Sequence, residues 1–314
     1  MFQRVKELLD GGTRFLVTTH IDPDGDAVGC AFATAFALTG LGKDATVYMR
    51  DSVPYRYQFL PAPPNVVHEI PDGPFDAVFA VDCGNFHRVG DGYERIGQMG
   101  PIVNIDHHDT NEAFGQINIL DARASSTAEL LYMIIKALDV TFNYAIAVNL
   151  YTGVFTDTGS FRYDNTNARA FAICQDMTNY GVVPSMVATE IYESHPKERF
   201  LLWCQVLATL ETYNGDKVAL VAVTRDMFEH TGTSRECADG FVETLKEMKG
   251  LEVAALLREV GEHRYKISMR SKGSIDVASV GRVFGGGGHR KAAGCVIEGA
   301  MDEVKKKLVE ALNA

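Results

Sequence analysis

Histidines and aspartates occur in short groups whose side chains have the chemistry to bind metal ions. The groups are His20, Asp22, Asp24 and Asp26, then Asp82, then Asp106, His107 and His108, and last Asp157 within TGVFTDTGSFRY. Carboxylates that lie a few ångströms apart cannot all stay ionised unless cations compensate their charge. If Asp24, Asp26, Asp82 and Asp157 converge, two divalent cations would balance their four negative charges.

The histidines would complete a mixed nitrogen and oxygen ligand shell around such cations. With His20 and His107 as nitrogen donors, the set suits Mn²⁺, and on ligand chemistry alone Zn²⁺, Fe²⁺ and Co²⁺ stay open. Two metal ions roughly 3.5–4 Å apart can activate a water molecule and stabilise charge on a phosphoryl group. The pattern therefore predicts a two-metal site for phosphoryl chemistry.

Short apolar runs precede these groups and predict the strands that position them. The runs cover residues 14–19, 44–49, 76–81 and 101–105, and helical patterns cover residues 26–38, 127–138, 144–155 and 168–179. Near-continuous apolar strands that alternate with helices are typical of a parallel, doubly wound α/β sheet. His20, Asp82 and Asp106 directly follow such strands, so we expect them at the carboxyl edge of the sheet, where ligands bind.

Each residue also has a structural interpretation. A single aspartate after a strand is usually a turn residue or a helix cap, which applies to Asp22 and to Asp26 before the following helix. The pair His107 and His108 would also suit an exposed loop. The metal site is favoured because all three groups follow strands at the same end of the predicted sheet.

The second half of the chain predicts a linker and a smaller domain. We expect a catalytic domain at residues 1–183, a helical linker at 184–213 and an α+β domain at 214–314, with the active site in the cleft between the domains. In the second domain, strands are expected at 217–224, 251–260 and 264–270, and helices near 235–248 and 301–312.

Composition limits the partners and the compartment. The 314 residues carry 41 acidic and 30 basic side chains, a formal net charge of −11, which disfavours binding of long nucleic acid. The six cysteines include no CxxC pair, which is typical of reduced thiols in a cytoplasmic protein. The start resembles no signal peptide, and the most apolar stretch, residues 27–41, is too short to span a membrane. We expect a cytoplasmic protein with no membrane partner; a homodimer stays open, without an interface signal.

A run of four glycines, Gly285–Gly288, precedes His289, Arg290 and Lys291. Glycines let backbone amides approach an anion closely, so the run predicts a substrate-binding loop, and a flexible solvated loop is the alternative. Neither GxxxxGK[ST] nor a strand-linked GxGxxG occurs, so no ATP or dinucleotide cofactor is expected. The aromatic residues of Phe161–Tyr163 would stack on a base or belong to the core.

Four segments together carry a family resemblance. HIDPDGDAVG (20–29), AVDCGN (80–85), NIDHH (104–108) and TGVFTDTGSFRY (152–163) resemble, in order, the motifs of the DHH phosphoesterase superfamily, and VFGGGGHRKAAG (283–294) resembles the glycine-rich signature of the DHH-associated C-terminal domain. Members of that superfamily hydrolyse phosphodiester, phosphomonoester or phosphoanhydride bonds with paired manganese ions. Cys30 is a departure, because relatives often carry serine there.

The resemblance implies a role for each matched residue. It implies that Asp82 bridges the two ions, that Asp106 accepts a hydrogen bond from a histidine, and that the catalytic His108 contacts the scissile phosphate. The implied ligands of one ion are His20, Asp24 and Asp82, and those of the other are Asp26, Asp82, His107 and Asp157. The implied substrate-binding residues are Arg270 and Ser271, which meet a distal phosphate, with Gly286, Gly287, Gly288 and His289.

Within the superfamily, the sequence is most similar to bacterial oligoribonucleases that also hydrolyse 3′,5′-phosphoadenosine. This similarity implies a manganese-dependent phosphodiesterase or exoribonuclease. It also implies that the same enzyme can hydrolyse phosphomonoesters. Short RNA oligomers, linear dinucleotides such as pApA and 3′,5′-phosphoadenosine would be cut by attack of a metal-bound hydroxide. The alternatives are a cyclic-dinucleotide phosphodiesterase, an inorganic pyrophosphatase, against which the glycine-rich segment argues, and a non-catalytic nucleotide sensor, which would be expected to lose ligands.

Overall fold

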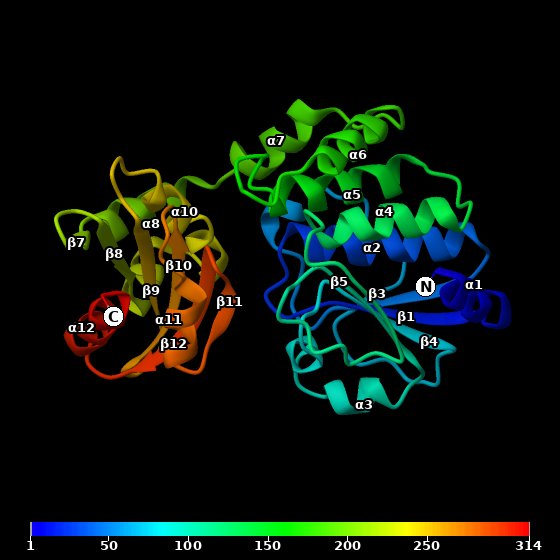
Figure 1. The fold of residues 1–314 in the computed structure, drawn as a ribbon, viewed down its shortest axis with the longest axis horizontal. Helices are drawn as coiled ribbons and strands as arrows, with labels where there is room; N and C mark the ends of the chain where they lie inside the picture. Colours follow the sequence, from blue (N-terminus) through cyan, green and yellow to red (C-terminus); the bar gives the residue numbers. More distant parts are fainter. Residues whose placement is uncertain (1, 314) are drawn as a thin grey trace. The chain divides into compact units, whose positions relative to one another are not determined.

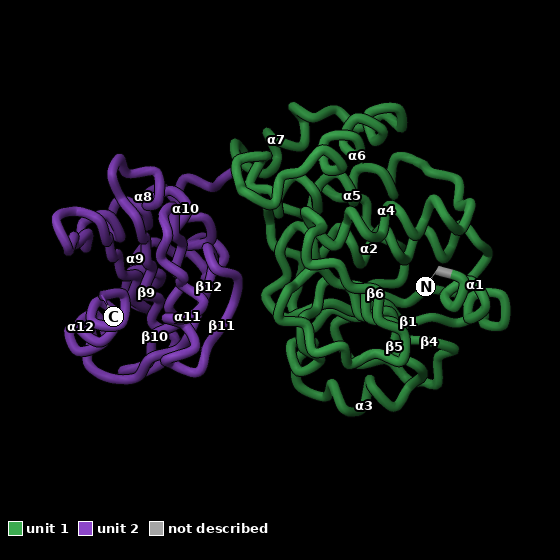
Figure 2. The backbone as a smooth tube through the Cα atoms, in the orientation of Figure 1, with its two compact units in different colours: residues 1–194 green, residues 195–314 purple. Residues whose placement is uncertain are grey.

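The computed structural model describes residues 2–313, which form two compact units. Unit 1 is Met1–Ser194 and unit 2 is His195–Ala314 (Figure 2). Each unit has its own sheet and its own hydrophobic core. The α/β sheet domain and the second, smaller α+β domain expected from the sequence are therefore confirmed.

Unit 1 contains a six-stranded sheet in the order β3-β2-β1-β4-β5-β6, and every pair of neighbours is parallel. The four expected strands are present to within a residue at each end, and two short edge strands join them. The strands are β1 (Arg14–Thr18), β2 (Asp44–Tyr48), β3 (Val66–Val67), β4 (Ala77–Val81), β5 (Ile102–Asp106) and β6 (Ile117–Leu120).

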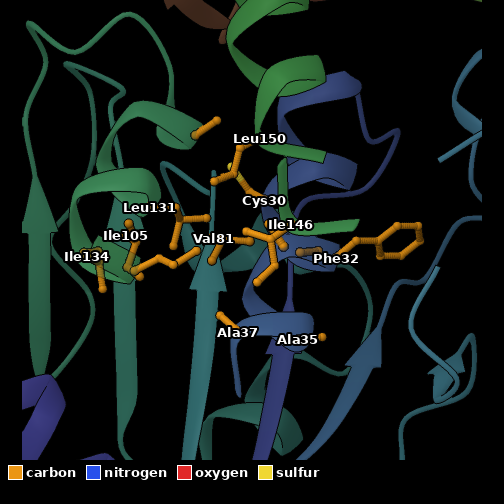
Figure 3. Packing of buried hydrophobic residues seen from close by; sticks show 14 of the residues in the cluster. Cys30, Phe32, Ala35, Ala37, Val81, Ile105, Leu131, Ile134, Ile146 and Leu150 are labelled. Atoms are coloured by element: carbon orange, nitrogen blue, oxygen red, sulfur yellow. The ribbon is translucent and has the colours of Figure 1, made fainter. Parts of the chain in front are cut away.

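Helices cover both faces of this sheet because successive side chains of each buried strand point to opposite faces. Phe15 and Val17 of β1 face the larger core, whereas Leu16 faces a smaller one. The larger core contains side chains of α1 (Phe2–Gly11), α2 (Gly25–Gly40), α4 (Thr127–Ala137) and α5 (Tyr144–Asp157). Figure 3 shows Val81 and Ile105 of the sheet among side chains such as Leu131, Ile146 and Leu150 of these helices.

The remaining helices of unit 1 lie around these layers. On the opposite face lie η2 (Phe86–Val89) and α3 (Tyr93–Gly97), as Figure 1 shows for α3. Beyond α5 lies α6 (Ala168–Thr178), and α7 (Pro184–Tyr192) contacts the short η1 (Tyr55–Tyr57).

The strand order creates a switch point between β1 and β4. After β1 the chain adds β2 and β3 on one side of it, and then adds β4, β5 and β6 on the other side. In an open doubly wound sheet, ligands bind outside the carboxyl ends of the strands where the winding direction reverses. The topology therefore assigns the ends of β1 and β4 to the binding site.

The helices α2 and α5 cross closely because small residues line their contact. A Cβ atom on Gly29 would overlap the backbone oxygen of Asn149. A Cβ on Gly153 would lie 2.6 Å from Oδ1 of Asp26 and 2.7 Å from Cβ of Ala128. These two glycines bring α2, α4 and α5 together beside the carboxyl edge of the sheet.

Unit 2 contains a mixed sheet in the order β11-β12-β10-β9-β8-β7, in which only β8 and β9 pair in parallel. The strands are β7 (Glu211–Tyr213), β8 (Val218–Val223), β9 (Val253–Gly261), β10 (Arg264–Ser271), β11 (Gly287–His289) and β12 (Ala292–Glu298). Apolar side chains of α11 (Val277–Val283) and α12 (Met301–Leu312) pack in the core on one face. The helices α8 (Lys197–Leu207), α9 (Arg225–Thr231) and α10 (Phe241–Lys246) complete the unit, and Trp203 of α8 packs 4.4 Å from the Phe241 ring.

Three details differ from the expectations. Residues 184–213 are not helical throughout: α7 ends at Tyr192, α8 begins at Lys197, and β7 follows, because the residue before Pro196 is disfavoured in a helix. The expected helix at 235–248 is split into η3 (Arg235–Ala238) and α10 by Gly240, whose φ is +84°. The glycine run is no open loop, since Gly287–His289 pairs with β12.

No helix among residues 2–313 has the length and apolar character that a membrane crossing requires.

Substitution of Gly29 by alanine is expected to destabilise the protein by about 1–3 kcal/mol, because the new methyl group would push α2 away from the backbone of α5. The free energy of unfolding, measured with urea, checks this. Gly40→Ala is the control in the same helix, since its Cβ would meet only Val140 at 3.7 Å. Equal stability of the two variants would contradict the close contact.

Candidate metal centre

The three groups of histidines and aspartates converge at the carboxyl edge of the unit 1 sheet. His20 follows β1, Asp82 directly follows β4, and Asp106 is the last residue of β5, with His107 after it. Asp82 has a φ of +55°, a left-handed conformation that turns the chain sharply at the strand end. His20, Asp82 and His107 are all buried.

One cluster of candidate ligand atoms contains His20, Asp24 and Asp82, which all lie within 4.8 Å of one another. Nδ1 of His20 lies 2.7 Å from the backbone oxygen of Ile21, which makes Nδ1 the protonated nitrogen. Nε2 of His20 is therefore the nitrogen on the side of the cluster, and it lies 3.6 Å from Oδ2 of Asp82. This is the orientation in which a histidine binds a metal ion.

A second cluster contains Asp26, Asp82 and His107, again within 4.8 Å, so that Asp82 belongs to both clusters. Nδ1 of His107 lies 3.3 Å from the backbone oxygen of Ala124. Its Nε2 lies 3.4 Å from Oδ2 of Asp157 and 3.9 Å from Oδ1 of Asp82. Five of the six residues predicted as metal ligands thus lie in two clusters that share Asp82, and the sixth, Asp157, lies against His107.

Asp24 and Asp26 differ in what their carboxylates contact. Oδ1 of Asp24 accepts hydrogen bonds of 3.0 Å from the backbone N–H groups of Asp26 and Ala27, so Asp24 is the N-cap of α2. The alternative that Asp26 caps this helix is therefore wrong. Asp26 instead accepts hydrogen bonds from Thr127 (2.7 Å) and Ala128 (3.0 Å) at the start of α4.

The aspartates of the centre repel one another. Burial, followed by the charges of Asp82 and Asp157, raises the pKa of Asp26 well above its usual range. Burial and the charges of Asp24 and Asp82 likewise raise the pKa of Asp157. Burial alone would raise the pKa of Asp82, but its hydrogen bond with His20 and the neighbouring histidines outweigh this effect and lower it.

This donor set fits divalent cations. Within residues 2–313, no lysine or arginine forms an ion pair with Asp26, Asp82 or Asp157, and the ionic partners of Asp82 and Asp157 are histidines. Cations would offset the repulsion that raises the pKa values of Asp26 and Asp157. Imidazole nitrogens and carboxylate oxygens are ligands for first-row divalent metals. The acidic and histidine groups can therefore bind metal.

His108 lies beside the clusters in a different environment. Its Nδ1 lies 2.6 Å from Oδ1 of Asp106, a fully buried carboxylate that also accepts a hydrogen bond of 2.5 Å from Asn111. Burial alone would lower the pKa of His108, but the hydrogen bond with Asp106 and the charges of Asp82 and Asp106 raise it to about 10. His108 is therefore protonated at neutral pH and can donate a hydrogen bond.

The thiol of Cys30, one turn after Asp26 in α2, contacts the centre as well. Its sulfur lies 3.2 Å from Oδ1 of Asp26 and donates the hydrogen bond. Burial and the charge of Asp26 raise the pKa of Cys30, so the thiol stays protonated and keeps this role as a donor.

Sequence reasoning missed the segment Ala124–Ala128, which contacts Asp26, Asp82 and His107. The available signal was the sequence Ser126-Thr-Ala-Glu129, a capping-box pattern. That pattern indicates where α4 begins, but it does not indicate which side chains meet the helix start.

The residues predicted to bind substrate lie in unit 2. Arg270 forms an ion pair of 2.8 Å with Glu243 of α10, and the neighbouring Ser271 is buried. Gly286 follows α11, and its N–H bonds to the backbone oxygen of Gly281. A Cβ atom on Gly286 would overlap the backbone of β12, and only Gly287–His289 form β11.

The aromatic residues after Asp157 pack against their neighbours. The ring of Phe161 stacks on Phe171 at a centroid distance of 4.9 Å and lies against the core of unit 1. Arg162 donates a hydrogen bond of 2.7 Å to the backbone oxygen of Gly159. Phe161 therefore packs against the core, which was the alternative to stacking on a base.

Known proteins resemble the chain in both units. The DHH family, N-terminal domain, matches residues 14–154, and the DHHA1 domain matches residues 215–314. A bifunctional oligoribonuclease and PAP phosphatase, NrnA, of Thermus thermophilus is 32% identical over 95% of this chain and 88% of its own length. The protein of the same name from Bacillus subtilis is 24% identical over 93% of this chain and 91% of its own length.

Solved structures share the fold. An exopolyphosphatase-related protein from Bacteroides fragilis superposes with a TM-score of 0.90 at 24% identity, over 99% of this chain and 95% of its own. RecJ from Thermus thermophilus, in complex with Mn²⁺, superposes with a TM-score of 0.57 at 14% identity, over 100% of this chain and 54% of its own. The chain belongs to the DHH family.

Proposed function

We propose that this protein is a metal-dependent phosphoesterase that hydrolyses short nucleotides. The observation that carries the proposal is the pair of ligand clusters that share Asp82 at the switch point of the sheet. Its support from relatives is the similarity to proteins named for oligoribonuclease and PAP phosphatase activity. The proposed substrates are short RNA oligomers, linear dinucleotides and 3′,5′-phosphoadenosine.

Two divalent cations, Mn²⁺ in this proposal, would be held by the residues of the two clusters. His20, Asp24 and Asp82 would bind one cation, and Asp26, Asp82, His107 and Asp157 the other. When bound, such cations stabilise charge on a phosphoryl group and lower the pKa of water. The structure of RecJ with Mn²⁺ is a precedent for this metal in a protein that shares the fold.

His108 would act on the phosphate as a hydrogen-bond donor. Because its Nδ1 faces Asp106, its Nε2 would be the nitrogen that meets a substrate. Asn111 holds Asp106 from the other side, so that the imidazole keeps one orientation. The hydrogen bond that His108 donates to Asp106 would stay in place when cations neutralise Asp82, so His108 could still protonate or polarise the leaving group.

Unit 2 would bind the distal phosphate of the substrate. Arg270 and His289 supply positive charge or hydrogen-bond donors, and Ser271 and Gly286–Gly288 supply hydroxyl and backbone donors. A local group of such donors would admit a small anion although the whole chain has a net charge of −11. A cleft shared by the two units, a homodimer and a cytoplasmic location stay predictions.

The proposal is tested with a 5′-phosphorylated RNA dinucleotide and 3′,5′-phosphoadenosine, each incubated with the full-length protein and Mn²⁺. We expect mononucleotide from the first substrate and phosphate from the second, because a two-cation site can stabilise both transition states. Chromatography and phosphate release measure the rates. Faster cleavage of pyrophosphate or a cyclic dinucleotide would replace the proposed substrates, and binding without hydrolysis would indicate a sensor.

Asp82→Asn is expected to lower the rate of hydrolysis by at least about 100-fold, because one substitution weakens both cation sites. Calorimetric titration with Mn²⁺ should show the loss of binding directly. Asp44→Asn removes an exposed carboxylate of the same unit and should change neither quantity. Near-normal turnover of Asp82→Asn with Mn²⁺ present would contradict the site.

His108→Gln is expected to lower kcat by roughly 10²–10⁴-fold, the usual contribution of a proton donor, while Mn²⁺ affinity changes little. The reason is that His108 bonds to Asp106 and is not among the ligands proposed for either cation, although it also lies near Asp82. Steady-state kinetics and calorimetry separate the two effects. An equal loss of Mn²⁺ affinity would assign His108 to the cation ligands instead.

A further inference from the structure

The start of α4 forms an organised contact surface for the proposed ligands. Residues Ser125, Ser126 and Thr127 are completely buried. Asp26 accepts hydrogen bonds from the backbone N–H groups of Thr127 and Ala128, although it lies about one hundred residues earlier in the chain. The first N–H groups of a helix have no partner within the helix, so this carboxylate satisfies two of them.

The hydroxyl of Thr127 makes a separate contact with Asp82. Its Oγ1 donates a hydrogen bond of 2.8 Å to Oδ1 of Asp82, while Oδ2 of the same carboxylate faces His20. His107 and His108 approach Oδ1 at 3.9 and 3.8 Å. The hydroxyl of Thr127 therefore fixes how the shared carboxylate is rotated between the two clusters.

The same segment contacts two further ligands. The backbone oxygen of Ala124 faces Nδ1 of His107 at 3.3 Å. Nδ2 of Asn165 lies 2.7 Å from the backbone oxygen of Ser125 and 3.3 Å from Oδ2 of Asp157. Asn165 thus links the segment to Asp157.

A buried carboxylate holds the segment in place. Oε2 of Glu129 accepts hydrogen bonds from the backbone N–H (2.9 Å) and the hydroxyl (2.7 Å) of Ser125, and one of 3.1 Å from Asn167. Its Oε1 lies 2.7 Å from Nε of Arg169. The segment is therefore fixed by a network that does not itself include the cation ligands.

We propose that Thr127 and Asn165 are positioning residues of the metal centre, which orient Asp82 and Asp157 for the two cations. The inference rests on the proposed function, because the cations are those proposed above. Thr127 has no role in holding a cation itself, and it acts through the carboxylate that both sites share. Hydrogen-bonded partners of metal ligands typically change metal affinity or activity by 10–100-fold when they are substituted.

The test compares Thr127→Val, which has the same shape but no hydroxyl, with Thr127→Ser, which keeps the hydroxyl. Mn²⁺ affinity by calorimetry is the main readout, and the Tm of the metal-free protein and the KM at saturating Mn²⁺ are measured beside it. We expect Thr127→Val to bind Mn²⁺ about tenfold more weakly. Thr127→Ser should stay within about twofold of the wild type, and the KM should not change in either variant.

Thr34→Val is the matched control, because Thr34 is a buried threonine of unit 1 whose hydroxyl bonds only within its own helix, to Cys30 at 2.7 Å. It should lower the Tm as Thr127→Val does and leave Mn²⁺ affinity unchanged. If Thr127→Val does not fold, Asn165→Ala provides the second variant, with the same expected loss of affinity through Asp157.

The outcomes separate the two proposals. Wild-type Mn²⁺ affinity in folded Thr127→Val and Asn165→Ala overturns the positioning roles and leaves the proposed function intact. A fall in Tm without a change in affinity also overturns them. Absence of Mn²⁺ binding to the wild-type protein overturns both proposals. Binding without hydrolysis of either nucleotide overturns the proposed substrates, while the affinity series still decides on Thr127.

Discussion

The repulsion between buried carboxylates at the ends of β1 and β4 is the constraint on which the arrangement of unit 1 depends. Asp26 and Asp82 are only 1% and 2% exposed, and interior charges without partners destabilise a fold by several kcal/mol. The chain offsets the two charges differently. Asp26 receives the N–H groups at the start of α4, and Asp82 receives imidazoles and a hydroxyl.

This requirement explains the glycines of the helical layer. For α4 to direct its first turn at Asp26, the helices α2, α4 and α5 must approach closely, and any side chain on Gly153 would occupy that space. Packing and electrostatics are therefore coupled in this region. The core that stabilises the sheet also determines the distance between the start of a helix and a carboxylate.

The sequence predicts the strands that carry the ligands because they are buried on both faces and so read as continuous apolar runs. The rule that ligands bind at the carboxyl ends of parallel strands then places His20, Asp82 and His107 together. Such reasoning misses β3 and β6, which are too short to form a pattern, and β12, whose alanines and glycine hide its alternation. It also cannot distinguish Asp24 from Asp26 as the cap of α2, since both lie at the start of the helical pattern.

The segment Ala124–Ala128, which contacts the ligands from the start of α4, could not be predicted for a different reason. Residues 121–126 (DARASS) show no apolar pattern, which is typical of a loop, and only tertiary packing brings the following Thr127 and Ala128 to Asp26. Asn111 and Asn165 are likewise ordinary loop residues in sequence. Asn111 meets Asp106 only because the chain reverses between them, and Asn165 meets Ser125, which is distant along the chain. Local patterns define elements and strand ends, whereas the hydrogen bonds between loops follow from the completed fold.

The order of the residues along the chain has a consequence for biosynthesis. All the proposed cation ligands, together with Asn165 and Arg169, precede His195, where unit 2 begins. Domains generally fold as units as they leave the ribosome, the N-terminal one first. Unit 1 can therefore close its carboxylate cluster while the ribosome is still translating unit 2, before the region proposed to bind the distal phosphate exists.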